Sequence, residues 1–440
     1  MVSIGYKLED SRFRIKKSNL EWIGISLLLL FSFVSSTTLL ISLFFLLFLL
    51  LQKEIGAIKI LNIITLRTII NPVIAVNIGT FQSVKWIIIM GCSIYLIFSF
   101  LKMRIKDSDK IRNILLLLIV FTGYNTITSL LFSSLPVVSI FKLLSYAIVF
   151  AAILIGIGYT YDKINWIKWM LNLLKLVIIP SVIFISLSFS FETNGYSFQG
   201  ITNQPNVFGI ISVLFVAISL VWLKLNKSKY IKIYTFSIII MTITLVVLSQ
   251  SRTAFISILL IIFTYIFFSD INKKLKFTIL PFFFSVLISL TFNNKIISFF
   301  NDFLSKGQTV DNLLFSRSNQ INGLLTNINN SPWFGNGFAV PVLPFRTFEF
   351  SYDYIVEPGN IILAILSYSG IIGFVIFILY IIKILLISKS YFMYFSYLPM
   401  AAILISMGEM VFFSTNNIGI WCYMFLAIYI FGGQIKRKHL

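Results

Sequence analysis

The sequence has one histidine, two cysteines and few charged residues for its length. Only 11% of its 440 residues are charged, whereas a soluble domain needs about 25% to cover its surface. The one histidine, His439, lies next to the last residue, so the body of the chain contains no imidazole. Catalytic zinc sites and Ser-His-Asp triads are therefore excluded, because both depend on imidazole. The cysteines, Cys92 and Cys422, lie far apart in apolar runs and are interpreted as small hydrophobic residues.

The sequence contains many long runs of apolar residues. Hydrophobic residues make up 58% of the chain, and several runs approach or reach the roughly 20 residues that span a bilayer core. A β-barrel would show short alternating segments instead. We therefore predict an all-α polytopic membrane protein with about 12–14 transmembrane helices, forming a single integral membrane domain over residues 1–440. The runs cover residues 20–34, 37–52, 57–78, 84–101, 111–133, 136–160, 166–191, 204–224, 231–249, 253–269, 276–293, 359–386, 391–413 and 416–433.

Basic residues are distributed unevenly between these runs. If the N-terminus is cytoplasmic, 26 of the 35 lysines and arginines lie on the inner side and six on the outer side, while Arg67, Lys142 and Lys175 fall within runs. This asymmetry predicts that both termini are cytoplasmic and that residues 1–20 form a tail, not a removed signal. The net charge of +20 is scattered in short clusters, so no nucleic-acid partner is expected.

The longest loop, residues 294–358, falls on the outer side in this topology. It is rich in Asn, Ser, Gly and Pro, with aromatic residues between them. A loop of this length is usually functional or disordered, and its aromatic content argues against disorder. We expect short helices that lie against the outer leaflet, with Arg346, Asp353 and Glu357 among their polar side chains.

Arg252 stands between two apolar runs, in the sequence SQSR. An interfacial arginine that extends toward lipid headgroups is the simplest interpretation. However, Ser251 and its neighbours add polar side chains, and the positive-inside rule disfavours a cation on the outer side. An anion site that faces a cavity is the alternative, with two helices joined by a tight polar turn.

Arg317 lies in a segment, residues 313–328, whose apolar residues recur at helical spacing. It is either a solvated loop charge or a second arm of an anion clamp. The segment is followed by NNSPWFGNGF. Its Gly-x-Gly is a weak signal for phosphate binding and is equally explained as a turn.

Amides and carboxylates supply the remaining candidates. Asn203, Gln204 and Asn206 surround Pro205 before an apolar run, where they either start a helix or bind sugar hydroxyls. Asn360 begins a long run after Glu357. Glu409, predicted to lie inside a run near its outer end, is either paired with a cation or functional. The clusters all fall on the predicted outer side, and together they describe a cavity suited to a lipid-linked anionic substrate.

Four motifs in order resemble the O-antigen polymerase and O-antigen ligase superfamily. They are GITNQPNVFGIISVLF, SQSRTAFISILL, SRSNQINGLLTNINNSPWFGNGF and GNIILAILSYSGIIGF, the last with Asn360 ten residues before Gly370, and they cover residues 198–375. The ligases carry a histidine just before that asparagine, where this sequence has Gly359. The difference favours a polymerase of the Wzy type.

The resemblance implies a GT-C-like, metal-independent glycosyltransferase without cofactors in the bacterial plasma (inner) membrane. Its donor would be a glycan linked through diphosphate to a polyprenyl carrier, and its acceptor a hydroxyl of another lipid-linked repeat unit. Other expected partners are membrane lipid and a chain-length regulator protein. The product would be O-antigen, as part of lipopolysaccharide, or capsule.

The resemblance also suggests roles for the polar residues. The arginines would stabilise the leaving diphosphate, and a carboxylate of Glu357, Asp353 or Glu409 would deprotonate or orient the acceptor hydroxyl. The catalytic candidates are Arg252, Arg317, Glu357 and Glu409. The substrate-binding candidates are Asn203, Gln204, Asn206, Ser251, Arg346, Asp353 and Asn360.

Two other functions stay open. One is a ligase that moves finished glycan to lipid A core or protein. The other, from a different class, is a transporter or lipid-linked oligosaccharide flippase. A flippase should show inverted repeats and polar residues deep in several spans, whereas the polar clusters here gather on one side.

Overall fold

The computed structural model describes residues 20–102, 108–191, 197–268, 315–339 and 359–439. Within these ranges the chain forms helices joined by turns and by irregular segments, and only isolated β-bridges occur between extended residues. The fold is all-α, as predicted. The part of the predicted loop that lies within residues 294–314 and 340–358, and the predicted run 276–293, fall outside the described residues.

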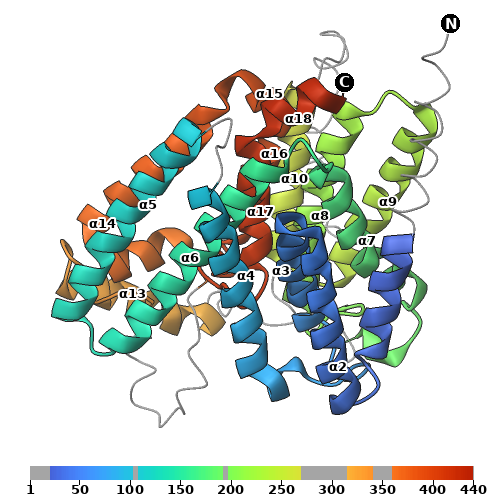
Figure 1. The fold of residues 1–440 in the computed structure, drawn as a ribbon. Coiled ribbons are helices and arrows are strands. Elements are labelled where there is room, and N and C mark those ends of the chain that lie inside the picture. Colours follow the sequence, from blue (N-terminus) through green and yellow to red (C-terminus); the bar gives the residue numbers. More distant parts are fainter. Residues whose placement is uncertain (1–19, 103–107, 192–196, 269–314, 340–358, 440) are drawn as a thin grey trace, which may run out of the picture.

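The predicted runs 57–78 and 166–191 are longer than their helices, which end at Thr68 and Ile183, whereas most other helices follow their runs within a few residues. Figure 1 shows the helices of the described residues. They are Leu20–Phe31, α2 Ser36–Leu46, η1 Leu47–Gln52, α3 Glu54–Thr68, η2 Ile78–Phe81, α4 Gln82–Lys102, α5 Ser108–Phe132, α6 Pro136–Thr160, α7 Trp166–Ile183, η3 Ser188–Ser190, α8 Pro205–Leu225, α9 Lys229–Leu248, α10 Arg252–Phe268, α13 Phe315–Asn330, α14 Ile361–Ile387, η6 Lys389–Tyr391, α15 Phe392–Phe395, α16 Tyr397–Ile405, α17 Gly419–Ile430 and α18 Gly432–His439.

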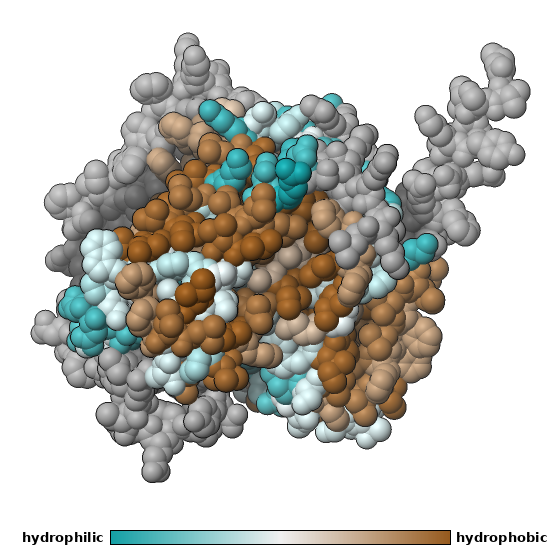
Figure 2. Space-filling model, turned by 60° about the vertical axis from the view of Figure 1, so that its left-hand side comes forward, coloured by the Kyte–Doolittle hydropathy of each residue, from teal (hydrophilic) through white to brown (hydrophobic). Residues whose placement is uncertain are grey.

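Seven helical stretches of the described chain are long and apolar enough to cross a membrane. They lie in η2–α4, α5, α6, α7, α8, α9 and α14, and four further apolar helices are shorter. The protein is therefore a multi-pass membrane protein. Figure 2 shows hydrophobic residues over much of the described surface on one face, while hydrophilic residues gather toward its margins. Lipid tails are the environment that such a surface fits.

Helices α8 and α17 form the centre of the bundle (Figure 1). Nearly every residue of α8 is buried, and all of α17 is. Both are apolar around their whole circumference, as expected for helices that are covered on all sides. Helix α8 packs against α7, α9, α10 and α16, and α17 packs against α3, α6, α14 and α16. The two helices thus fix the positions of the elements that start near them.

The segment before α8 is tied to the end of α3. Asn71 N–H donates to the Ile201 carbonyl and Asn203 N–H donates to the Ile69 carbonyl, both at 2.9 Å. Gly200 has a left-handed φ of +57°, and a side chain there would overlap that of Ser181. These contacts hold the start of α8 at a fixed place.

Helix α14 is broken at Gly370, which has φ +64° and ψ −170°. The turn that follows α13 docks into the break. Ile371 N–H donates to the Pro332 carbonyl at 2.8 Å, and Gly337 N–H donates to the Tyr368 carbonyl at 3.1 Å. The Gly-x-Gly sequence therefore forms a turn here. A side chain at Gly335 would overlap the backbone of α14, and one at Gly337 would overlap Ser133.

Replacing Gly335 by alanine should destabilise this junction strongly. Gly335 has a φ of +73°, and an added Cβ would overlap the Tyr368 backbone. Backbone strain alone costs about 1–3 kcal/mol, and the overlap adds to it, so the melting temperature in detergent should fall by several degrees. Gly123→Ala is the matched control, because nothing lies within 4 Å of a Cβ there. Equal melting temperatures for the two variants would contradict the interpretation.

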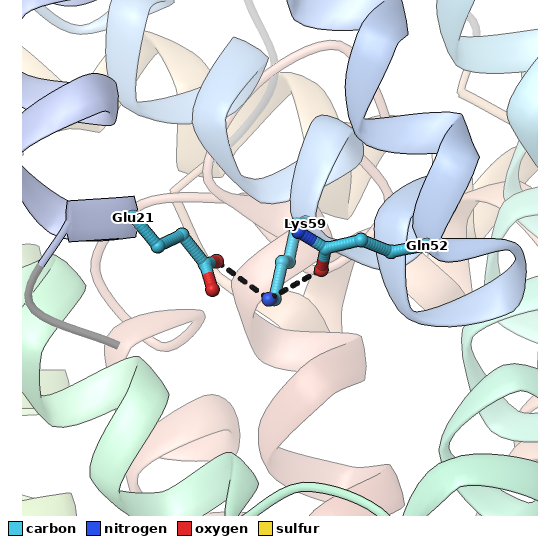
Figure 3. A network of polar contacts seen from close by, with 3 residues as sticks. All are labelled: Glu21, Gln52 and Lys59. Atoms are coloured by element: carbon cyan, nitrogen blue, oxygen red, sulfur yellow. Dashed lines mark hydrogen bonds and ion pairs between the residues drawn. The ribbon is translucent and has the colours of Figure 1, made fainter. Parts of the chain in front are cut away.

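A polar network joins the first helix to α3 (Figure 3). The Lys59 ammonium, on α3 and buried, lies 2.5 Å from a Glu21 carboxylate oxygen and donates to Gln52 Oε1 at 2.7 Å. A buried ammonium without its carboxylate is strongly destabilising. Lys59 is therefore a structural cation that closes the N-terminal part of the bundle.

Glu21→Ala should lower the stability by about 3 kcal/mol, because it leaves the Lys59 charge buried and unpaired. Adding Lys59→Met removes that charge and should restore most of the melting temperature. Thermal unfolding of the two single variants and the double variant in one detergent measures the coupling. Additive losses would argue against the ion pair.

Candidate active site

Four elements meet at a turn, Ser406–Glu409, that follows α16. The Ser406 carbonyl accepts a hydrogen bond from Ile361 N–H, at the start of α14, at 3.0 Å. Gly408 lies so close to Thr253, near the start of α10, that a Cβ would overlap its side chain. Asn206 Nδ2, in the first turn of α8, donates to Glu409 Oε1 at 2.9 Å. Three of the four resembling motifs thus converge on one turn.

The predicted apolar run 391–413 is not one helix. Helix α16 ends at Ile405, and residues 406–418, the α16–α17 segment, are turns and irregular chain before α17 begins. Glu409 therefore lies in a break between helices, and its predicted place inside a continuous span is wrong. Hydropathy misses the break because apolar residues continue on both sides of Ser406, Gly408 and Glu409. Irregular backbone at membrane depth is tolerated where it lines a cavity.

A cavity of about 610 Å³ opens beside this segment. Its walls come from α4, α6, α8 and the α16–α17 segment. Glu409 lines it, together with Gln204 and Asn206 from the start of α8. The other lining side chains are Trp86, Val138, Phe141, Lys142, Ser145, Val207, Ile210, Met410, Val411, Phe413, Ser414, Thr415, Asn416, Asn417 and Ile418.

Arg252 is the first residue of α10, and its side chain is half-buried. The turn before it is tight, as predicted: α9 ends at Leu248, and Gln250 has a positive φ of 53°. Ser251 is buried and packs against Gly209 of α8, where a Cβ would overlap its side chain. The residue after Arg252, Thr253, touches Gly408, which precedes Glu409 in the chain. Arg252 and Glu409 are thus brought to the same turn.

Three helix N-termini point to this region, those of α8, α10 and α14. The helix dipole makes each such end favourable for negative charge, although the first N–H groups of α14 already donate within the protein. Asn360 caps α14, because its Oδ1 accepts from Ile362 N–H at 3.0 Å and Leu363 N–H at 3.2 Å. Arg252 and Lys142 add formal positive charge at the same end of the bundle.

Some predicted site residues lie elsewhere or outside the described residues. Asn203 is exposed and does not line the cavity; its backbone makes the bridge to α3. Arg317 falls in the first turn of α13, with its side chain outside the described residues. Arg346, Asp353 and Glu357 also lie outside them.

Arg67 and Lys175, two of the cations inside predicted spans, make contacts away from the cavity. Arg67 Nε donates to Ser32 Oγ at 2.8 Å, and its guanidinium lies over the Phe33 ring. The Lys175 ammonium lies 4.7 Å from the centre of the Tyr234 ring. Lys142, by contrast, lines the cavity. The polar run 414–417, which forms another wall, was not recognised from sequence; four consecutive polar side chains between apolar runs were the signal.

Residues 236–378 match the family model described as O-antigen ligase. This match confirms the resemblance to the O-antigen polymerase and ligase superfamily. It indicates a glycosyltransferase-like enzyme of the membrane that acts on lipid-linked oligosaccharides. The matched region includes Arg252, Arg317 and Asn360, whereas Asn206 and Glu409 lie outside it and join it only in space. Comparison with curated proteins gives no match.

Proposed function

We propose that the protein is a polysaccharide polymerase of the Wzy type. It transfers a glycan from a polyprenyl diphosphate to a hydroxyl of another lipid-linked repeat unit, on the outer face of the bacterial plasma membrane. The observation that carries the proposal is the Ser406–Glu409 turn, where a carboxylate held by Asn206 adjoins the start of α10 with Arg252. The positive-inside distribution of basic residues supports an outer position for this end of the bundle.

The reaction needs a base on one side of the anomeric carbon and positive charge on the other. The Glu409 carboxylate takes the proton of the acceptor hydroxyl. The acceptor oxygen then forms the new bond to the anomeric carbon. At the same time the bond between the anomeric carbon and the diphosphate oxygen breaks. The diphosphate leaves with the electron pair, so its negative charge grows in the transition state. Arg252 and the N-terminus of α10 stabilise that charge, and Arg317 is proposed to do so from α13.

A ligase is the second candidate, favoured by the description of the matching family model. Gly359 precedes Asn360, where the resembling ligases carry histidine, and this supports the polymerase. If the protein is a polymerase, we also predict a chain-length regulator protein as its partner.

The two functions can be distinguished with purified protein in nanodiscs. With the lipid-linked repeat unit as sole substrate, a polymerase makes a ladder of longer lipid-linked chains. A ligase makes no ladder and gives product only when lipid A core is added. Absence of both products would overturn the glycosyltransferase proposal.

A further inference from the structure

The cavity beside Glu409 has the chemistry of a carbohydrate site. Six of its lining side chains are amides or hydroxyls from the start of α8 and the α16–α17 segment. They are Gln204, Asn206, Ser414, Thr415, Asn416 and Asn417. Amides both donate and accept, as sugar hydroxyls require. The volume of about 610 Å³ falls within the range of small-molecule sites.

One wall is aromatic. The Trp86 and Phe141 rings, from α4 and α6, meet edge to face with their centroids 5.4 Å apart. Both line the cavity. The C–H face of a sugar ring is apolar and carries partial positive charge, so it packs well on the negative face of an aromatic ring. Amides and hydroxyls line other parts of the same cavity, so a bound sugar has partners for its apolar face and its hydroxyls.

Asn417 adds an amide to the wall of the cavity. Its Oδ1 atom is buried and has no hydrogen-bond partner among the described residues, although Asn417 lines the cavity. A buried polar atom of this kind is normally paired by protein, water or ligand. Because that atom has no access from the cavity in this structure, Asn417 contributes to the site as a lining amide.

The wall formed by residues 414–417 is held in place by contacts to other elements. Thr415 Oγ1 donates to Ser145 Oγ of α6 at 3.2 Å. The buried Lys85 ammonium donates to the Asn416 carbonyl at 3.3 Å. The Phe413 ring packs edge to face on Phe338, with centroids 5.0 Å apart. A wall fixed by contacts to several elements is suited to selective binding because its groups are already positioned.

We infer that this cavity is the acceptor subsite, which takes the terminal sugars of a glycan and presents one hydroxyl to Glu409. The inference rests on the proposed function and deepens it. Glu409 joins the cavity to the start of α10, so the acceptor approaches from the side of α4 and α6 while the diphosphate lies toward Arg252. The proton passes from the hydroxyl to the carboxylate, and the hydroxyl oxygen forms the glycosidic bond as the diphosphate leaves.

The test varies the acceptor and the donor separately. Purified protein in nanodiscs receives the lipid-linked repeat unit as donor and, as acceptor, an excess of the lipid-free repeat-unit oligosaccharide prepared from the surface polysaccharide of the producing cells. Only products that contain the lipid-free oligosaccharide are counted. Asn417→Ala and Trp86→Ala should each raise the KM for the acceptor about tenfold or more, with the KM for the donor unchanged. Ile87→Ala is the control, because Ile87 adjoins Trp86 but is exposed on the outside of α4.

A second measurement covers the case in which a variant folds poorly. Saturation-transfer NMR should detect binding of the same oligosaccharide to the wild-type protein, and Asn417→Gln should weaken it. An unchanged acceptor KM in both variants, with chains still forming, would overturn the acceptor subsite but leave the polymerase intact. A raised donor KM instead would assign the cavity to the donor. Failure of the wild type to extend any chain would overturn the proposed function itself.

Discussion

Glu409→Gln is expected to slow chain extension by about 10²–10⁴-fold, the usual contribution of a general base. The amide has nearly the same shape as the carboxylate but cannot take the acceptor proton. It can still meet Asn206, whose Nδ2 lies 2.9 Å from Glu409 Oε1, so folding should be preserved. The measurement is the rate of ladder formation by purified protein at saturating donor and acceptor.

Two comparisons make this result specific. Asp109→Asn changes an exposed carboxylate in the first turn of α5, away from the cavity, and should leave the rate unchanged. Asn206→Ala keeps the Glu409 carboxylate but removes the hydrogen bond that positions it, so a smaller loss of about tenfold is expected, as for one hydrogen bond to a charged group. A wild-type rate for Glu409→Gln, with normal protein yield, would rule out Glu409 as the base. Asp353 and Glu357 would then be the remaining candidates for the base.

Arg252→Ala is expected to reduce kcat about 10²–10³-fold, because the charge that develops on the leaving diphosphate loses a preorganised partner. Cells that depend on the variant should display single repeat units in place of long chains, with unchanged protein levels. Gel analysis of the surface glycan, with quantification of the protein in membranes, measures both.

Further substitutions distinguish stabilisation of the diphosphate by Arg252 from a general effect of positive charge. Lys229→Ala removes an exposed cation at the start of α9, the opposite end of the helix pair that Arg252 joins, and should leave chain length normal. Arg252→Lys keeps the charge but loses the planar fork that matches phosphate oxygens, so partial activity is expected. Arg317→Ala should resemble Arg252→Ala. Normal chain length in both arginine variants would contradict the diphosphate clamp.

The cavity shows why distant segments of this sequence must be considered together. Asn206 and Glu409 are 203 residues apart, and they meet because α8 and α16 pack side by side. Nothing in the spacing of either segment specifies that contact. Similarly, the Gly-x-Gly turn is explained by the break at Gly370, which lies more than thirty residues away. Both partners of that contact looked like independent weak motifs in the sequence.

Patterns in the sequence were enough to predict the fold class, the bounds of most helices and the resemblance of the motifs around Arg252, Arg317 and Asn360. Apolar runs of bilayer length have one stable solution, because every backbone polar group in lipid must be satisfied within its own helix. The packing of the helices was needed to see that α16 ends at Ile405 and that Glu409 faces a cavity with Lys142 and the polar side chains of residues 414–417. Hydropathy is a local sum and does not register a break flanked by apolar residues, whereas the position of a carboxylate depends on which helices pack around it.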